Sequence, residues 1–201
     1  MRLLLLVCLL LFSSSRLYAQ VTNAVTLPIS ARTQKVTYTE RIPTTGVSRA
    51  ELYARAKGWL AQSTSLTHAV PVTEKKEVGV LVARAKMTIP LLQARARIEQ
   101  PIEYTIAINV QEGYYQYLLC DYQVIAGGKH LPLEAQLTPA MRQDPQHTFT
   151  VRQYETQISR QSTAVMIMLQ SAMQNPAASA KKEDPLAPYK IGFPKAGSQK
   201  H

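Results

Sequence analysis

The sequence has little cysteine, little glycine and only one long apolar run, and each shortage excludes a class of protein. Two Cys in 201 residues exclude a small domain held together by several disulfide bonds. Eight Gly exclude a collagen-like repeat, and an apolar run confined to residues 3–12 excludes a polytopic membrane protein. The chain is nevertheless 46% hydrophobic and only 18% charged, which supplies enough apolar material for one packed core.

Recognisable catalytic and ligand-binding motifs are lacking too. There is no Gly-x-Ser-x-Gly elbow, and residues 127–129 do not have the spacing of a phosphate-binding loop. The histidines stand apart from one another and from any Cys pair: His68, His130, His147 and His201. The sequence therefore predicts no metal site, no cofactor and no enzymatic activity. One alternative stays open, a hydrolase-type enzyme whose site the fold assembles from Glu40, His68 and Asp121.

The N-terminus has the layout of a signal peptide. Arg2 precedes the apolar run, and small Ala19 before Gln20 offers a cleavage point, so residues 1–19 are predicted to be removed on export. The run is too short to span a bilayer, which disfavours an uncleaved anchor and leaves no transmembrane helix in the mature chain. Bulky Val7 disfavours lipid attachment at Cys8. The protein is expected in the periplasm, the outer envelope or outside the cell, with Cys120 as its only thiol.

Acidic residues are scarce, since 13 Asp and Glu face 23 Lys and Arg, for a formal net charge of +10. The signal takes Arg2 and Arg16 with it, and the tail after residue 175 has five Lys against two acids, so the body carries about +5. For an exported basic protein, the candidate partners are another envelope protein, an anionic glycan or an anionic lipid surface, while nucleic acid is disfavoured. The oligomeric state is not predicted.

Periodicity predicts both strands and helices. Apolar and polar residues alternate over residues 34–42, which predicts a strand with one charged residue, Glu40, on its apolar side. Residues 49–63 are predicted to form a helix that begins at a capping box, Ser48 to Glu51. Residues 77–89 are β-like, but a change of apolar phase predicts a bulge or a strand break near Val82-Ala83. Pro90 excludes a central ladder position. Residues 102–110 and 114–124 form a hairpin.

The C-terminal half is predicted to end in a long helix. Residues 126–148 are an irregular excursion with one helical turn at 133–137, and the helix follows over 151–175, with its apolar stripe facing inward. Four segments result: the signal 1–19, an N-terminal leader 20–33, a single α+β domain 34–175 and a basic, flexible tail 176–201.

Several of these motifs together resemble an exported bacterial family. The motifs are Tyr38-x-Glu40, the stretch from Gly46-Val47-Ser48 through Glu51-Leu52-Tyr53 to Trp59, Tyr104-x-Ile106-x-Ile108, Gly113-x-Tyr115-x-Tyr117, Asp121-Tyr122 and Leu131-Pro132-Leu133-Glu134. They resemble the domain-of-unknown-function family 4468, over about residues 34–135. The resemblance implies a TATA-binding-protein-like (TBP-like) fold, with a curved antiparallel sheet packed against helices. It implies no catalytic residues, and the DNA binding of the fold's namesake does not carry over.

Two groups of side chains are candidates for partner contact. Aromatic rings on an open sheet can stack on bases, sugars or partner side chains. Strand alternation puts Tyr115 and Tyr117 on one face and Tyr114 and Tyr122 on the other. Four basic residues with even spacing could line one sheet face: Arg84, Lys86, Arg95 and Arg97. The alternatives are that one set of tyrosines packs beneath the helices while the other lies at the rim, and that the basic residues are solvated charges that protect a sheet edge.

Overall fold

The structure is a computed structural model that describes residues 25–63, 68–93 and 95–174. The predicted signal peptide and the predicted tail after residue 175 lie outside the described residues. Both remain predictions from sequence.

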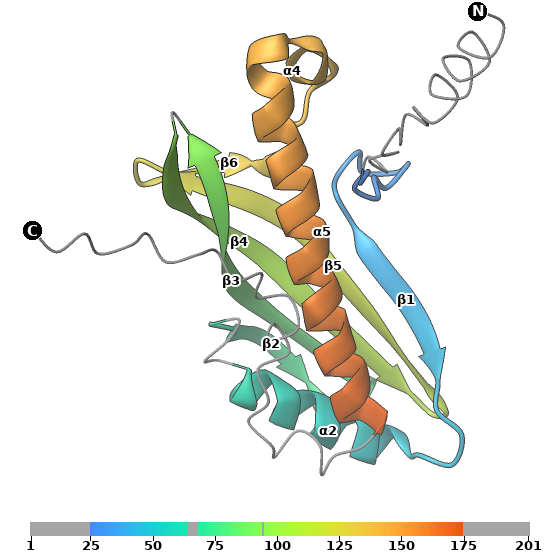
Figure 1. The fold of residues 1–201 in the computed structure, drawn as a ribbon. Coiled ribbons are helices and arrows are strands. Elements are labelled where there is room, and N and C mark those ends of the chain that lie inside the picture. Colours follow the sequence, from blue (N-terminus) through green and yellow to red (C-terminus); the bar gives the residue numbers. More distant parts are fainter. Residues whose placement is uncertain (1–24, 64–67, 94, 175–201) are drawn as a thin grey trace, which may run out of the picture.

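Six strands form one antiparallel sheet (Figure 1). Its main path runs β1-β5-β4-β3-β2, and β6 pairs with the far end of β5. The strands are β1 (Tyr38–Pro43), β2 (Val70–Lys75), β3 (Val80–Gln93), β4 (Ala96–Gln111), β5 (Tyr114–Ala126) and β6 (Lys129–Pro132). The short strands β1, β2 and β6 are therefore edge strands, and the long strands β3 to β5 make the centre.

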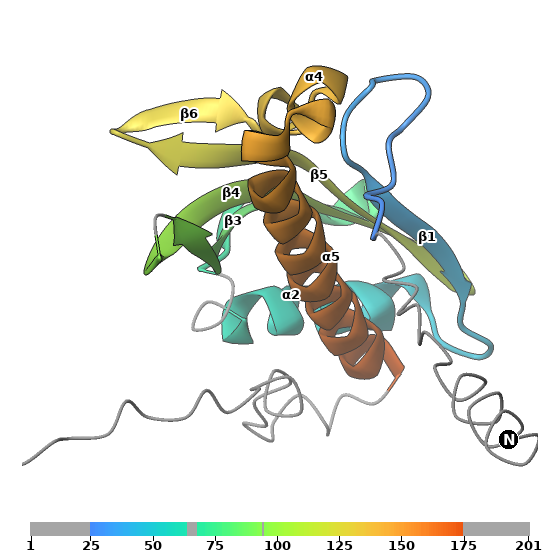
Figure 2. The same ribbon diagram turned by 45° about the horizontal axis from the view of Figure 1, so that its top comes forward.

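Two helices cover one face of this sheet. α5 (Pro145–Gln174) crosses it diagonally, and α2 (Arg49–Gln62) packs near one end (Figures 1 and 2). The remaining helical elements are short: η1 (Lys76–Val78), η2 (Leu133–Gln136) and α4 (Pro139–Gln143). The core lies between the sheet and the helices, and the predicted α+β fold with a covered antiparallel sheet is confirmed. Leu27, from the predicted leader, belongs to that core at 2% exposure.

The start of α2 follows the sequence signal in part. Ser48 Oγ accepts a hydrogen bond from the Glu51 amide at 3.3 Å, as a capping box requires. The Glu51 carboxylate does not complete the box, because it accepts from Arg55 Nη2 at 2.6 Å, one turn along the helix. Trp59 points inward at 4% exposure, as predicted, and the helix ends one residue early, at Gln62.

α5 begins six residues earlier than its apolar stripe indicates. Pro145 occupies its first position, where a missing amide hydrogen costs nothing, and Asp144 Oδ1 accepts from the Gln146 amide at 2.9 Å. The Asp144-Pro145 pair is therefore a helix start and not part of an irregular excursion. Residues 126–148 also contain β6 and α4, which sequence periodicity did not reveal, besides the predicted turn at η2.

The prediction of a bulge or break within β3 near Val82-Ala83 is wrong, because the irregularity is on the neighbouring strand. β3 keeps one phase over its whole length, with its odd-numbered residues from Leu81 to Leu91 buried. The register shift is on β2, between Pro71 and Thr73, opposite Ala83 and Val82. Pro90 sits inside β3, but β2 pairs only with residues 80–84, so β3 is locally an edge where the proline lies.

A second irregularity reverses the facing of side chains in β5. Glu103 of β4 pairs with Gln123 of β5, and the next pair joins Thr105 to Cys120. A step of two residues along β4 therefore matches a step of three along β5. The extra residue is at Asp121, whose φ of 53° lies in the left-handed region. Odd-numbered residues face the helices before this bulge, and even-numbered residues face them after it.

Gly79 offers a stability test of the close approach between η1 and β4. Its φ is +74°, and a Cβ there would lie 2.2 Å from the backbone oxygen of Val110. Since the Val110 amide also donates to the Gly79 oxygen at 2.8 Å, neither backbone can move away cheaply. Gly79→Ala is expected to lower the free energy of unfolding by about 2–5 kcal/mol, measured by urea denaturation.

Gly113→Ala is the matched control for this prediction. Its φ is +75°, but nothing lies within 4 Å of the added Cβ. It should therefore lose only about 1–2 kcal/mol, the usual penalty of left-handed backbone for a residue with a Cβ. Equal losses for the two variants would contradict the close contact at Gly79.

Candidate functional site

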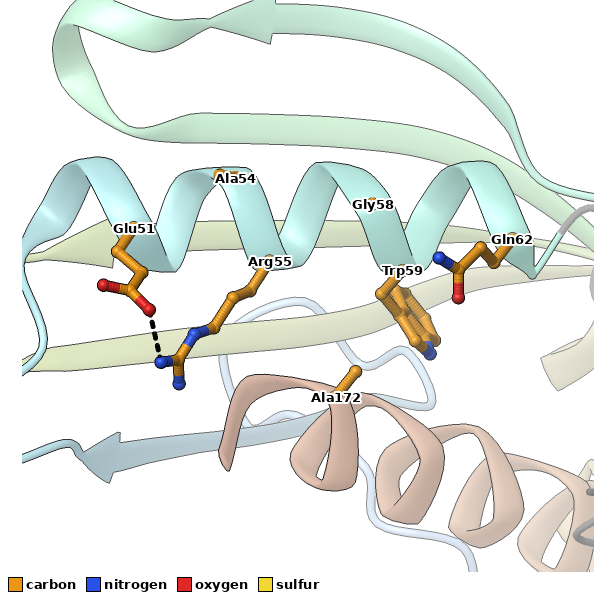
Figure 3. Close-up of a pocket in the computed structure, with 7 residues that line it drawn as sticks. All are labelled: Glu51, Ala54, Arg55, Gly58, Trp59, Gln62 and Ala172. Atoms are coloured by element: carbon orange, nitrogen blue, oxygen red, sulfur yellow. Dashed lines mark hydrogen bonds and ion pairs between the residues drawn. The ribbon is translucent and has the colours of Figure 1, made fainter. Parts of the chain in front are cut away.

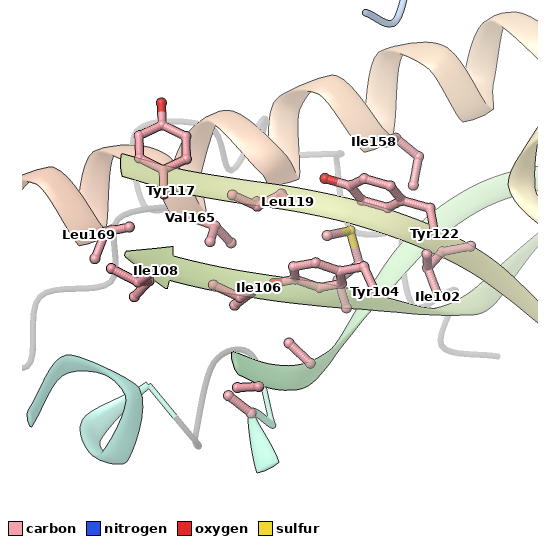
Figure 4. Packing of buried hydrophobic residues seen from close by; sticks show 14 of the residues in the cluster. Ile102, Tyr104, Ile106, Ile108, Tyr117, Leu119, Tyr122, Ile158, Val165 and Leu169 are labelled. Atoms are coloured by element: carbon pink, nitrogen blue, oxygen red, sulfur yellow. The ribbon is translucent and has the colours of Figure 1, made fainter. Parts of the chain in front are cut away.

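Three of the four candidate tyrosines belong to the core. Tyr115, Tyr117 and Tyr122 are at most 2% exposed, so none of them can contact a partner. Figure 4 shows Tyr117 and Tyr122 beneath α5, where Tyr122 stacks on Tyr104 with ring centroids 5.4 Å apart. The prediction that Tyr122 faces away from Tyr115 and Tyr117 is wrong, because the bulge at Asp121 shifts the alternation by one residue.

Tyr114 is the one candidate tyrosine on the face that the helices do not cover. It pairs with Pro43 of β1, and its ring lies under the guanidinium of Arg41, 3.7 Å from Cζ to the ring centroid. This cation–π contact holds Arg41 against the sheet, and it covers one side of the ring. Arg41 was not among the residues predicted from sequence.

The dispersed catalytic residues do not come together. Glu40 faces α5, where its Oε2 accepts from Tyr117 OH at 2.8 Å and from Gln170 Nε2 at 3.0 Å. Asp121 lies at the β5 bulge, paired with Lys35 at 2.5 Å. Neither forms a hydrogen bond to the other or to His68 within the part of the chain that the structure describes. Glu40, the charged residue on the apolar side of the first strand, thus links edge strand β1 to α5 through its hydrogen bond to Gln170.

The four basic candidates do not line one groove. Arg84 and Lys86 lie on the open face of β3, next to buried Glu103 of β4, with Arg84 Nη1 at 3.3 Å and Lys86 Nζ at 3.7 Å from its carboxylate oxygens. Arg95 and Arg97 lie far along the β3–β4 hairpin, where Arg97 pairs with Glu99 at 3.0 Å. The long strands separate the two pairs, since Arg97 is opposite Leu92, eight residues beyond Arg84.

Positive charge is nevertheless concentrated on the open face. Six basic side chains lie on or beside it: Arg32, Lys35, Arg41, Lys75, Arg84 and Lys86. The negative charges of Glu103 and Asp121 offset two of these positive charges. Arg97 and Glu99, which form an ion pair, add no net charge. The described residues hold 16 Lys and Arg against 11 Asp and Glu, so this face holds four of the five excess positive charges.

Between the charges, the open face is polar. Hydroxyl and amide side chains repeat across its strands: Thr39, Thr88, Thr105, Asn109, Gln111 and Gln116. The apolar side chains at its centre, Val82, Ala107 and Leu118, are only partly exposed. Within the described ranges no helix covers this face (Figure 2).

A cleft of about 230 Å³ opens at one side of the open face. The turn at residues 30–37 forms one wall, and the β5 bulge forms the other. Eight residues line it: Ser30, Arg32, Thr33, Lys35, Thr37, Leu118, Cys120 and Asp121. Six of the eight are polar or charged, with two cations and a carboxylate among them, although most of the surface that they expose in the cleft is apolar. The sequence singled out Asp121 and Cys120 for other roles and missed the rest, because the turn residues lie in the predicted leader and the start of the first strand.

Unusual backbone geometry borders this cleft on both sides. Of the four described non-glycine residues with positive φ, Gln34 at 56° lies in the turn and Asp121 at 53° lies in the bulge. The turn is pinned at its base, since Val36 is fully buried and its amide donates to Glu134 Oε1 at 2.8 Å. Strained backbone that the surrounding structure fixes is often found at binding sites.

The Cys120 thiol in this cleft stays protonated near neutral pH. Burial, with a smaller contribution from the Asp121 carboxylate 3.6 Å from Sγ, raises the pKa of Cys120 to about 11. Because only the thiolate reacts, alkylation of Cys120 by iodoacetamide at pH 8 should be about 100-fold slower than that of an ordinary thiol. Mass spectrometry of the Cys120 peptide against pH measures this rate. A half-maximal rate near pH 9 would contradict the shift.

A larger hollow, of about 340 Å³, lies between α2 and the end of α5 (Figure 3). Its main polar group, Arg55, is already engaged, donating to the Met173 backbone oxygen at 2.5 Å and to Glu51 at 2.6 Å. Arg55 thus caps the C-terminal end of α5 and ties the two helices together. We assign this hollow to helix packing.

The described residues contain neither a metal-binding cluster nor a membrane-spanning helix. No group of three or more His, Cys, Asp or Glu side chains there is placed to hold a metal ion. None of the described helices combines the length and the apolar character that a membrane span requires.

The likeness to known proteins is consistent with this architecture. Residues 38–124 match the family described as a domain of unknown function (DUF4468) with TBP-like fold. The chain carries a DUF4468 domain. This confirms the family resemblance seen in the motifs, and the DUF4468 match spans β1 to the main part of β5. No curated protein matches the chain.

Solved structures show the same fold at low sequence identity. A DUF4468 family protein from Bacteroides ovatus ATCC 8483 matches with a TM-score of 0.62 and 13% identity, over 75% of this chain and 91% of that one. A TBP-like protein from Parabacteroides distasonis ATCC 8503 matches with a TM-score of 0.59 and 14% identity, over 74% and 97%. At these identities the likeness shows the fold and carries no function.

Proposed function

We propose that this DUF4468 protein is an exported, non-enzymatic binding module that holds an acidic glycan on its open sheet face. The observation that carries the proposal is the segregation of charge. The helix-covered side is nearly neutral, whereas the open side, apart from the Arg97–Glu99 ion pair, has six basic residues against two acids. A face of this kind attracts a polyanion over distances comparable to the Debye length.

The polar groups between the charges favour a glycan over a lipid surface. Side-chain amides and hydroxyls such as Asn109, Gln116 and Thr105 can donate to and accept from sugar hydroxyls. Membrane-surface binding usually needs large apolar side chains that insert among the basic ones. Of the most exposed of these, residues 78, 149 and 167 lie on η1 and on α5, and Val70 and Val72 lie on the β2 edge, where Val70 is opposite Arg84. Among the described residues, the centre of the face has no apolar side chain as exposed as these.

Nucleic acid fits this face less well. Binding of single strands relies on exposed aromatic rings for base stacking, but three candidate tyrosines are buried and Tyr114 lies under Arg41. The predicted signal peptide also directs the chain to a compartment where glycans, and not nucleic acids, are the abundant polyanions.

The test is retention of the purified protein on immobilised polygalacturonate at about 50 mM and about 500 mM salt, with neutral dextran as the control matrix. The proposal expects retention on polygalacturonate that is lost at high salt, and none on dextran. Anionic phosphatidylglycerol vesicles and duplex DNA are compared in the same buffer. Failure to bind polygalacturonate at low salt, or stronger binding to vesicles or DNA, would overturn the proposal.

A further inference from the structure

The cleft beside the open face has a different chemistry from the face itself. The open face presents mostly cations and neutral polar groups, but the cleft combines cations, hydroxyls and a carboxylate within one hollow. Arg32 stands at the tip of the turn and makes no ion pair in the part of the chain that the structure describes. Lys35 reaches across the cleft to Asp121 Oδ1 at 2.5 Å.

The Asp121 carboxylate is held in place but can still accept further hydrogen bonds. One oxygen accepts from Lys35, and the other lies 3.6 Å from the Cys120 thiol. Each carboxylate oxygen can accept a second hydrogen bond, so Asp121 can still take one from a ligand hydroxyl. An ordinary anion would gain nothing from this carboxylate and would be repelled by it.

The turn that carries the cations is rigid. The Ser30 amide donates to the Lys35 oxygen at 2.9 Å, and the Gln34 amide donates to the Ser30 oxygen at 2.8 Å. Leu27 before the turn and Val36 after it are both buried in the core. A site whose groups are fixed in advance loses little entropy when a ligand binds.

We propose that this cleft binds a single uronic acid residue, with Arg32 and Lys35 holding its carboxylate and Asp121 accepting from a ring hydroxyl. The inference rests on the proposed function, since the sugar would be one unit of the acidic glycan on the adjoining face. Ser30, Thr33 and Thr37 add hydroxyl groups around it. The cleft, at about 230 Å³, has room for one monosaccharide.

The test compares three small ligands on the full-length protein by NMR titration: galacturonate, acetate and galactose. The unaltered protein is expected to bind galacturonate at least about fivefold more tightly than acetate, which has the charge but no ring hydroxyls, and to bind galactose weakest. Arg32→Gln should weaken galacturonate binding about fivefold, whereas Arg152→Gln, which removes the same charge from α5, should have no effect.

Asp121→Asn tests the specificity of the site. Asparagine tolerates the left-handed backbone at this position, and the substitution removes the charge that disfavours acetate. The ratio of galacturonate to acetate affinity should therefore fall toward one. Bound galacturonate should also slow the alkylation of Cys120, which lines the cleft. Equal binding of galacturonate and acetate, or a ratio unchanged in Asp121→Asn, would overturn the inference.

The two binding experiments distinguish an error in the cleft proposal from an error in the proposed function of the open face. If the face does not bind glycan, polygalacturonate is not retained, whatever happens with the monosaccharide. If only the cleft proposal is wrong, polygalacturonate still binds in a salt-dependent way, and the monosaccharide shows no preference over acetate.

Discussion

Replacing Arg41 and Lys86 by glutamine is expected to weaken binding to polygalacturonate about tenfold at low salt. Both side chains lie on the open face, and Arg41 is held there against Tyr114. Each exposed charge contributes up to about 1 kcal/mol to an ionic contact, so two of them account for a loss of this size. Arg84 is left unchanged so that buried Glu103 keeps an ionic partner at 3.3 Å and the fold is not disturbed.

The matched control removes the same amount of charge from the helices. Arg49 on α2 and Arg152 on α5 are both exposed, and replacing them by glutamine also lowers the net charge by two. If binding depends on the open face, this variant should change the affinity less than about twofold. Equal losses for the two variants would mean that only total charge matters, and would count against a defined face. Calorimetric titration at about 50 mM and 150 mM salt measures both.

The stability of the protein is expected to fall steeply above pH 10 because of its buried tyrosines. Burial raises the pKa of both Tyr104 and Tyr122 well above 10, the ordinary value for a phenol. Above pH 10 the unfolded chain loses these two protons and the folded chain keeps them, so the folded state becomes progressively less stable. The two phenols together should lower the free energy of unfolding by about 2 kcal/mol between pH 10 and pH 11.

Two conservative variants separate ionisation from hydrogen bonding. The Tyr104 hydroxyl is buried without a hydrogen-bond partner among the described residues, so Tyr104→Phe should leave the stability at pH 7 unchanged or higher. Tyr122 OH lies 2.8 Å from Ser162 Oγ, so Tyr122→Phe should lose about 1 kcal/mol at pH 7.

Each of these variants should also reduce the slope above pH 10, so that about 1 kcal/mol less stability is lost between pH 10 and pH 11. Urea denaturation between pH 7 and pH 11 gives both quantities. An unchanged slope in Tyr104→Phe would show that this phenol ionises in the folded protein as easily as in the unfolded chain.

Most of the fold could be predicted because its signals are local. The alternation from Ile102 to Val110 depends only on which side chains face the helices, and the inward stripe of α5 follows from its helical period. The start of α5 was missed because the prediction followed its apolar stripe and not the Asp144-Pro145 pair. A short edge strand such as β2 has little alternation of its own, since its residues are mostly exposed.

The candidate site was harder to predict because it depends on register. One extra residue at Asp121 moves Tyr122 from the open face into the core, and strand alternation cannot reveal such an insertion. Arg84 and Lys86 were placed on one sheet face correctly, but Arg41 and Lys75 join them only through pairing between strands distant in sequence. The cleft needs the turn at residues 30–37 to meet β5, which is a tertiary contact without a local signal.

The most direct test of the open face is an NMR titration of the ¹⁵N-labelled protein with short oligogalacturonates. The account predicts that the largest amide shifts fall on the strands of the open face, near residues 39–41, 84–88, 105–109 and 116–118, and beside them at residues 30–37 and 121. The exposed sides of α2 and α5 should stay unchanged. Shifts centred on the helices, or spread evenly over the molecule, would contradict the account.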